Sequence, residues 1–317
     1  MRAFLHRYAH ELVLSVILIA ALATLASITD TFFTTANLLN QGRLVAEVGL
    51  VALPMTFIII TGGIDLAVGS MLGLAAITLG VGWKNVGLPL PLAIPSSILV
   101  ATAAGYFNGL LITKLRVPPL IMTLATLALF RGLAEGISQA RSVRGYPDWF
   151  FVLGQGEIAG VPSQLWILLV AIVVFWVVLT RTTFGRALYA IGHNETAARF
   201  SGIPVDRIKL SIYTASGFMS GLAGWIFVSR VSTTRSDMGT GLELDVIAAV
   251  VLGGTSIFGG IGTIAGTVLG FTLIQLLKNG LALTGVKGDA TIVVMGTVLI
   301  LSILITNFLR RGRAGPH

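Results

Sequence analysis

Residues 44–61 read LVAEVGLVALPMTFIIIT and residues 66–83 read LAVGSMLGLAAITLGVGW, with the tetrapeptide GGID between them. Each stretch approaches the length of about 20 apolar residues that a helix needs to cross a bilayer. Similar stretches recur along all 317 residues, at 12–29, 44–61, 66–83, 92–113, 119–133, 165–180, 210–229, 246–258, 263–277 and 290–308. The sequence therefore predicts an all-α polytopic membrane protein with about ten transmembrane helices, several of them broken by glycine, in a single transmembrane domain over residues 1–317.

The composition agrees with a membrane environment. Only 11% of the residues are charged and 55% are hydrophobic, with a mean hydropathy of +0.92. Soluble domains carry roughly 25% charged residues, so most of this protein's surface must face lipid. The net charge of +8 is scattered between the apolar stretches and is not gathered beside aromatic residues, which argues against a nucleic-acid partner.

The sequence lacks the residues that several kinds of chemistry require. The chain has no cysteine, and its four histidines, His6, His10, His193 and His317, lie outside the apolar stretches. We therefore expect no metal site, no cofactor and no catalytic residues. The phosphate-binding motif G-x-x-x-x-G-K-[ST] does not occur in the sequence. The protein is predicted not to be an enzyme, and any ATP must be hydrolysed by a separate chain.

Two runs of glycine interrupt the predicted helices, TGGID at residues 61–65 and GGTSIFGGIG at residues 253–262. At membrane depth, irregular backbone occurs only where protein buries it or where it lines a watery cavity, so both runs are candidate pore elements. Asp65 follows the first run, where its carboxylate could cap the next helix or could mark a solute pathway. Glu47 lies inside an apolar stretch, so it too is a candidate marker of a solute pathway.

A short helix is predicted in the loop 181–209. Asn194 suits an N-cap, Glu195 the first turn and Arg199 the last turn, while Gly202 and Pro204 provide the stop. Its apolar positions, Ala197, Ala198 and Phe200, are too few to build a core, and we expect the helix to pack on little else in its own chain. It is predicted to dock into a groove of another protein, or alternatively to lie on the lipid surface with Phe200 as its anchor.

The distribution of Lys and Arg predicts the orientation in the membrane. With ten helices and a cytoplasmic N-terminus, 12 of these residues fall in inside segments and 9 in outside segments. We therefore predict that both termini and the loop 181–209 lie in the cytoplasm. The two larger outside segments are then 134–163 and 230–245.

Taken together, these residues resemble the permease subunits of bacterial ABC monosaccharide importers, the ribose, xylose, arabinose and rhamnose family, over about residues 37–309. The resemblance rests on GGIDLAVGS at 62–70, Asn108-Gly109, the segment 118–127, the loop 185–202 and AAVVLGGTS at 248–256. Ala67 stands where family members often have serine. The stretches 146–150 and 235–239 are most similar to the branch that handles rhamnose or autoinducer-2.

The resemblance implies a set of partners and a location. The loop 185–202 would be a coupling segment seated on separate ATPase subunits, through Gly192, Asn194, Glu195, Ala197, Ala198, Arg199 and Gly202. A periplasmic sugar-binding protein would dock on the opposite face, and a second permease chain, identical or related, would complete the pore. The protein would lie in the bacterial inner membrane.

We therefore interpret the chain as the permease of an ATP-driven monosaccharide importer that works by alternating access. Candidates for polar contacts along the translocation path are Thr61, Asp65, Ser70, Asn108 and Thr255. One alternative is a proton-coupled secondary carrier that uses Glu47 or Asp65. Another keeps the importer architecture and changes the cargo to nucleosides or branched-chain amino acids.

Overall fold

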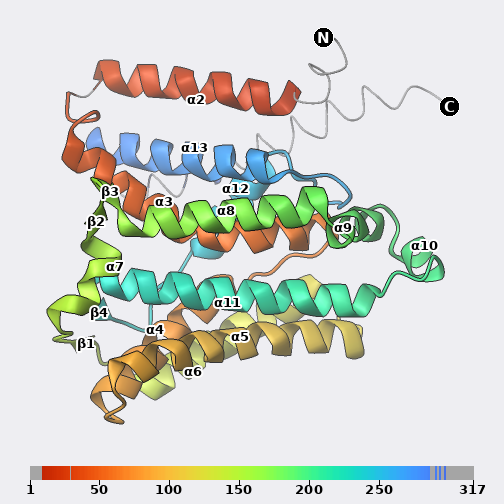
Figure 1. Cartoon of the computed structure of the whole chain (residues 1–317), viewed down its shortest axis with the longest axis horizontal. Coiled ribbons are helices and arrows are strands. Elements are labelled where there is room, and N and C mark those ends of the chain that lie inside the picture. Colours follow the sequence, from red (N-terminus) through yellow and green to blue (C-terminus); the bar gives the residue numbers. More distant parts are fainter. Residues whose placement is uncertain (1–8, 29, 286–289, 291–292, 294–295, 298–317) are drawn as a thin grey trace.

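The structure is a computed structural model that describes residues 9–28, 30–285, 290, 293 and 296–297. Its helices are α2 (Ala9–Ile28), α3 (Thr35–Ile60), α4 (Val68–Lys84), α5 (Leu90–Lys114), α6 (Pro119–Ser138), η1 (Asp148–Phe151), α7 (Val152–Gln155), α8 (Ser163–Arg181), α9 (Thr183–His193), α10 (Glu195–Phe200), α11 (Val205–Val231), α12 (Leu242–Leu252) and α13 (Ile264–Leu283). The long helices run side by side in a bundle (Figure 1). The all-α prediction is confirmed for this part of the chain.

Six of the described helices are long and apolar enough to cross a membrane, namely α3, α5, α6, α8, α11 and α13. The prediction of about ten spans is therefore confirmed only in part. The predicted span 246–258 is wrong: α12 has 11 residues, about 16 Å of helix, and it ends where Gly253 and Gly254 interrupt it. Most of the predicted span 290–308 lies outside the described residues.

The short strands and the short helix α10 lie at opposite ends of the bundle (Figure 1). β1 (Val143–Arg144) pairs with β4 (Thr233–Thr234), and β2 (Glu157–Ile158) pairs with β3 (Val161–Pro162), both antiparallel. We call this the strand end, and the other the α10 end. The first turn of α2 lies at the α10 end.

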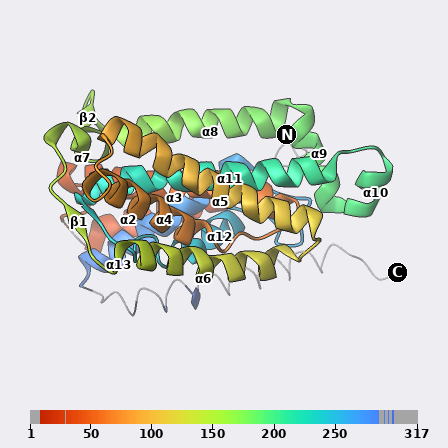
Figure 2. The same ribbon diagram turned by 90° about the horizontal axis from the view of Figure 1, so that it is seen from below.

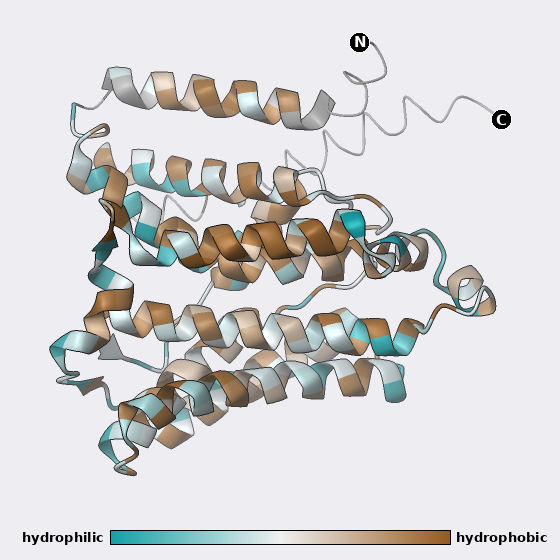
Figure 3. Ribbon diagram, viewed as in Figure 1, coloured by the Kyte–Doolittle hydropathy of each residue, from teal (hydrophilic) through white to brown (hydrophobic). Residues whose placement is uncertain are grey.

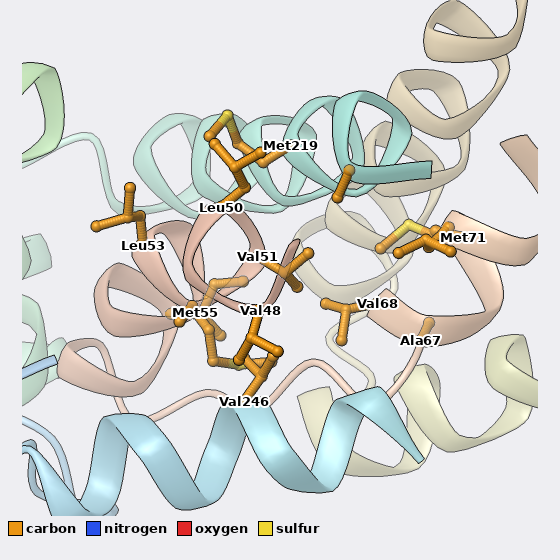
Figure 4. Packing of buried hydrophobic residues seen from close by; sticks show 14 of the residues in the cluster. Val48, Leu50, Val51, Leu53, Met55, Ala67, Val68, Met71, Met219 and Val246 are labelled. Carbon is orange, nitrogen blue, oxygen red and sulfur yellow. The ribbon is translucent and has the colours of Figure 1, made fainter. Parts of the chain in front are cut away.

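Helix α3 forms the centre of the core, because every residue from Ala46 to Ile60 is buried. In Figure 4, Leu50 lies toward Met219 of α11 and Val48 toward Val246 of α12. A helix that is apolar on all sides must be surrounded by other elements. The central position of α3 means that one buried helix, with Pro54 in its interior, reaches from the strand end of the bundle to the α10 end.

Helices on the outside of the bundle expose apolar side chains. Figure 2 shows α8 along one edge and α6 along the opposite edge, and Figure 3 shows that most residues of α8 are hydrophobic. On α8, Val170 is 64% exposed and Leu169 is 50% exposed. These side chains suit contact with lipid rather than water.

Close approach of backbones holds α5 and α11 together. A Cβ atom added to Gly105 of α5 would lie 2.3 Å from the carbonyl oxygen of Tyr213 and 2.8 Å from the Cα of Gly217, both on α11. No larger residue fits there without separating the two helices. Small residues serve this purpose in membrane bundles because lipid provides no hydrophobic drive for helix association.

Candidate functional site

The predicted short helix in the loop 181–209 is present as α10, with caps at both ends. The side-chain oxygen of Asn194 accepts a hydrogen bond of 2.9 Å from the N–H of Ala197. At the other end, the N–H of Gly202 donates to the carbonyl of Arg199 and the N–H of Ile203 to that of Ala198. Gly202 has a φ of +80°, which completes a Schellman motif and requires glycine. The predicted capping is confirmed.

Ion pairs fix α10 to the first turns of α11. Glu195 contacts Arg199 at 2.9 Å and Lys209 at 2.5 Å, and Arg199 also contacts Asp206 at 2.5 Å. Burial raises the pKa of Glu195, but the hydrogen bonds from Lys209 and Arg199 outweigh this effect and leave its pKa below the ordinary value. Four charges on two helices thus set the angle at which α10 leaves the bundle.

One face of α10 is buried against the rest of the chain, contrary to the expectation from the sequence. Ala198 is only 4% exposed and belongs to the hydrophobic core, so the expectation that α10 packs on little else in its own chain is wrong at this position. The physical reason is the Schellman turn, which folds the chain back so that Ala198 faces inward. Phe200 is 89% exposed and Ala197 is exposed too. A partner protein would therefore meet Phe200 and Ala197 and not Ala198.

The end of α9 contacts the last residue of α3, just before the first glycine run, and the second glycine run. A Cβ atom on Gly192 would lie 1.9 Å from the carbonyl oxygen of Ile60 and 2.4 Å from the nitrogen of Gly260. The N–H of Gly260 donates to the carbonyl of Ile60 at 2.8 Å, and the hydroxyl of Tyr189 donates to the carbonyl of Gly262 at 2.7 Å. We call these five residues the glycine junction. It joins the break after α3, the break after α12 and the segment that carries α10.

Asp65 is fully buried between α4 and α11. One carboxylate oxygen accepts from the N–H of Ala67 at 3.0 Å, and the other accepts from the hydroxyl of Ser216 at 2.9 Å. The first bond satisfies the N–H of Ala67, just before α4 begins, but α4 itself has no side-chain cap, so the capping interpretation is not met at the N–H groups of this helix. The second bond ties the break after α3 to α11, a contact that the sequence did not indicate.

The other four candidate path residues are also buried. Thr61 donates to the carbonyl of Ile58 and Ser70 to that of Ala67, so both hydroxyls bond to their own segment. The polar side-chain atoms of Asn108 and Thr255 have no hydrogen-bond partner among the described residues. A buried polar group without a partner costs about 1–3 kcal/mol, which favours a water or solute near these two side chains.

Glu47, the other acidic residue in question, has a cationic partner. Nε and Nη2 of Arg230 donate to its two carboxylate oxygens at 2.6 and 3.0 Å. Sequence reasoning missed Arg230 as the partner of Glu47, although a carboxylate inside an apolar stretch signals that a cation must lie nearby. Among the described residues, no three His, Asp or Glu side chains gather closely enough to hold a metal ion.

The features above define a class of protein: a polytopic helical membrane protein with broken helices at its centre and a short capped helix projecting from one end. Residues 35–303 match the family model described as "Branched-chain amino acid transport system / permease component", and the chain belongs to this family. Its members are transport components, so this chain is not an enzyme. No solved structure matches the chain.

Curated relatives in bacteria cover nearly the whole chain. A ribose import permease protein of Bacillus subtilis is 43% identical, over 88% of this chain and 87% of its own. A ribose import permease protein of Haemophilus influenzae is 37% identical, over 92% and 91%. An autoinducer 2 import system permease protein of Escherichia coli is 36% identical, over 94% and 92%. The resemblance to permease subunits of ABC monosaccharide importers is confirmed.

Proposed function

We propose that this chain is the pore-forming permease of an ATP-driven importer for a monosaccharide in the bacterial inner membrane. The relatives that are ribose and autoinducer 2 import permeases support this cargo class. In this proposal, separate ATPase subunits supply the energy, a periplasmic binding protein delivers the solute, and a second permease chain completes the pore. Uptake measurements are needed to identify the particular sugar, including whether it is rhamnose.

The glycine junction is the observation that carries the proposal. An ATPase that binds α10 would move α9 as well, since only Asn194 separates these two helices. At the junction the backbones of Gly192, Ile60 and Gly260 touch, and no side chain lies between them to absorb a displacement. Motion of α9 is therefore passed to both broken segments at once. Packed elements transmit such shifts because close-packed interiors deform little.

The proposal also assigns the orientation. The α10 end is the cytoplasmic end, because the ATPase must meet ATP there. The first turn of α2 lies at the same end, which supports a cytoplasmic N-terminus (Figure 1). The strand end then faces the periplasm and the binding protein.

Two alternative functions make different demands on the residues. A proton carrier that uses Glu47 would protonate a carboxylate that Arg230 holds by two hydrogen bonds. Breaking a buried ion pair in this way costs about 3–5 kcal/mol, which disfavours Glu47 as the proton site. Cargo of the branched-chain amino acid class is supported by the description of the family model alone.

Reconstitution tests the proposed function. The chain is purified with its co-eluting subunits and placed in vesicles, and uptake of D-ribose, L-rhamnose and leucine is measured with ATP present and the proton gradient collapsed by a protonophore. We expect uptake of a sugar that requires ATP and persists without the gradient. Uptake by the isolated chain alone, or uptake that stops with the protonophore, would refute the proposal.

A further inference from the structure

The described residues form a cavity of about 610 Å³ at the strand end, between α3, α11, α12 and α13. Its lining includes seven charged side chains, together with Leu44, Phe227 and Val231. We call it the outer cavity. Its volume falls within the roughly 300–1,000 Å³ of small-molecule sites. None of the five candidate path residues lines it.

Charged side chains in the lining are arranged in pairs. Glu47 binds Arg230, Lys278 binds Asp245, and Arg235 binds Asp237. The first two pairs link α3 to α11 and α12 to α13 across the cavity wall. Ionisable groups at such positions are costly against lipid, and they occur where a bundle encloses a water-filled space. The outer cavity therefore faces water, not hydrocarbon.

The charges in this wall nearly cancel. Each anion has a cation beside it, and the remaining cation, Arg144, is exposed and has no ion-pair partner in the described part of the chain. A solute with a net charge would compete with the existing pairs. A neutral solute could instead use the donor and acceptor sites that the pairs leave free.

The free sites match hydroxyl groups. Arg230 uses Nε and Nη2 for Glu47, which leaves the donors of Nη1, and a carboxylate accepts more than one hydrogen bond per oxygen. A sugar hydroxyl both donates and accepts, so it fits between a carboxylate and a guanidinium. The ring of Phe227 also lies in the lining, and the Arg230 guanidinium lies over it, 5.0 Å from its centroid.

We propose that the outer cavity is a transit site for a neutral polyhydroxylated solute, with the Glu47–Arg230 pair at its floor. This inference rests on the proposed import function and adds the place where the solute is held. The pair binds by hydrogen bonds and not by net charge. Solute enters from the strand end, opposite α10, before the bundle changes conformation.

The absence of cysteine makes the test direct, because each introduced cysteine is the only thiol in the permease. Leu44→Cys and Val231→Cys place a thiol on facing helices of the cavity, while Val170→Cys makes the same valine change on the exposed face of α8. The assembled importer in vesicles is treated from the strand side with a charged, membrane-impermeant thiosulfonate. The rate of labelling is then measured with D-ribose, L-rhamnose or leucine present.

We expect both cavity thiols to be labelled at least about tenfold faster than the thiol of Val170→Cys, since thiosulfonates react with thiolates in water. One of the two sugars should slow labelling of the cavity thiols, and leucine should not. Labelling no faster than that of the α8 control, or protection by leucine alone, or no protection by any probe, would overturn the proposal.

Measurements of sugar uptake and ATP hydrolysis distinguish a failure of the transit site from a failure of the proposed import function. Labelled Val231→Cys should lose about tenfold in sugar uptake, while ATP hydrolysis stimulated by the binding protein continues, because the α10 end is unchanged. Unlabelled protein that never shows ATP-dependent uptake would refute the import function, whereas the labelling and protection rates would still report on the cavity. Full uptake after complete labelling would overturn the transit site.

Discussion

The two ends of the bundle differ in their packing: the glycine junction is close-packed, and the strand end contains a cavity. At the glycine junction, backbone touches backbone: a single methyl group at Gly192 would lie 1.9 Å from the oxygen of Ile60. At the strand end, ion pairs surround a cavity of about 610 Å³. In the proposed function, the junction transmits displacement because it has no free space, and the proposed transit site accepts a solute because it has space lined with polar atoms.

Helix α3 connects the two ends. Glu47 in the floor of the outer cavity and Ile60 in the glycine junction are 13 residues apart on this buried helix, about 20 Å along its axis. In the proposed mechanism, a displacement at the junction reaches the ion pair through this one packed helix, which contains Pro54. Variants at the outer cavity, at the glycine junction or in α10 measure how much each end contributes to stability, uptake and ATPase binding.

The largest expected effect is at the cavity floor. Glu47→Gln leaves the half-buried guanidinium of Arg230 without its anion and should lower the free energy of unfolding by about 3 kcal/mol. The double variant Glu47→Gln/Arg230→Met removes both charges and should recover much of the loss. Thermal unfolding in detergent is measured for the wild type, Glu47→Gln, Arg230→Met and the double variant. A double variant less stable than the sum of the two single changes would contradict the role of the pair.

The glycine junction should be the next most sensitive site. Gly192→Ala forces the backbones apart, and overpacking of this kind costs roughly 1–3 kcal/mol, so ATP-dependent uptake should fall about 30-fold. Gly132→Ala on α6 is the matched control, because a Cβ atom there meets no described atom within 4 Å. Wild-type uptake in Gly192→Ala, measured beside this control, would show that the junction transmits nothing.

A smaller effect is expected at the exposed face of α10. Phe200→Ala removes an aromatic side chain that is 89% exposed and should raise the Kd for the ATPase about tenfold without changing the stability of the permease. Phe218→Ala, a half-exposed phenylalanine on α11, is the matched control. Sedimentation or fluorescence titration with purified ATPase measures both. Equal affinity of the two variants would leave α10 without a docking role.

The smallest effect concerns the ion pairs that hold α10. Because the pKa of Glu195 is lowered in the folded protein, its charge stabilises the fold above the ordinary pKa of 4.5, and this stabilisation is lost as the pH falls through the lowered value. Glu195→Gln should therefore cost about 0.5 kcal/mol at pH 7 and nothing at strongly acidic pH. Unfolding measured from pH 7 downward gives the difference, and a difference that grows toward acid would contradict the assignment.

Local patterns in the sequence predicted local structure well. Asn194, Glu195, Arg199 and Gly202 specify α10 because capping depends on neighbours within one or two turns. The glycine runs marked where helices end, since backbone freedom is a property of the residue itself. The predicted span 246–258 is wrong for a related reason. Mean hydropathy averages over a stretch of residues, so it does not show that α12 ends after 11 residues at Gly253.

Apolar stretches, glycine breaks and caps could thus be identified from the amino-acid order, because each depends on contacts between near neighbours. The partnership of Glu47 with Arg230, 183 positions along the chain, could not, and neither could the meeting of Gly192 with Ile60 and Gly260. These contacts arise only when helices pack, since packing geometry depends on every side chain in the interface at once. The inward face of Ala198 belongs to the same category, and it moves the expected docking surface to Phe200 and Ala197.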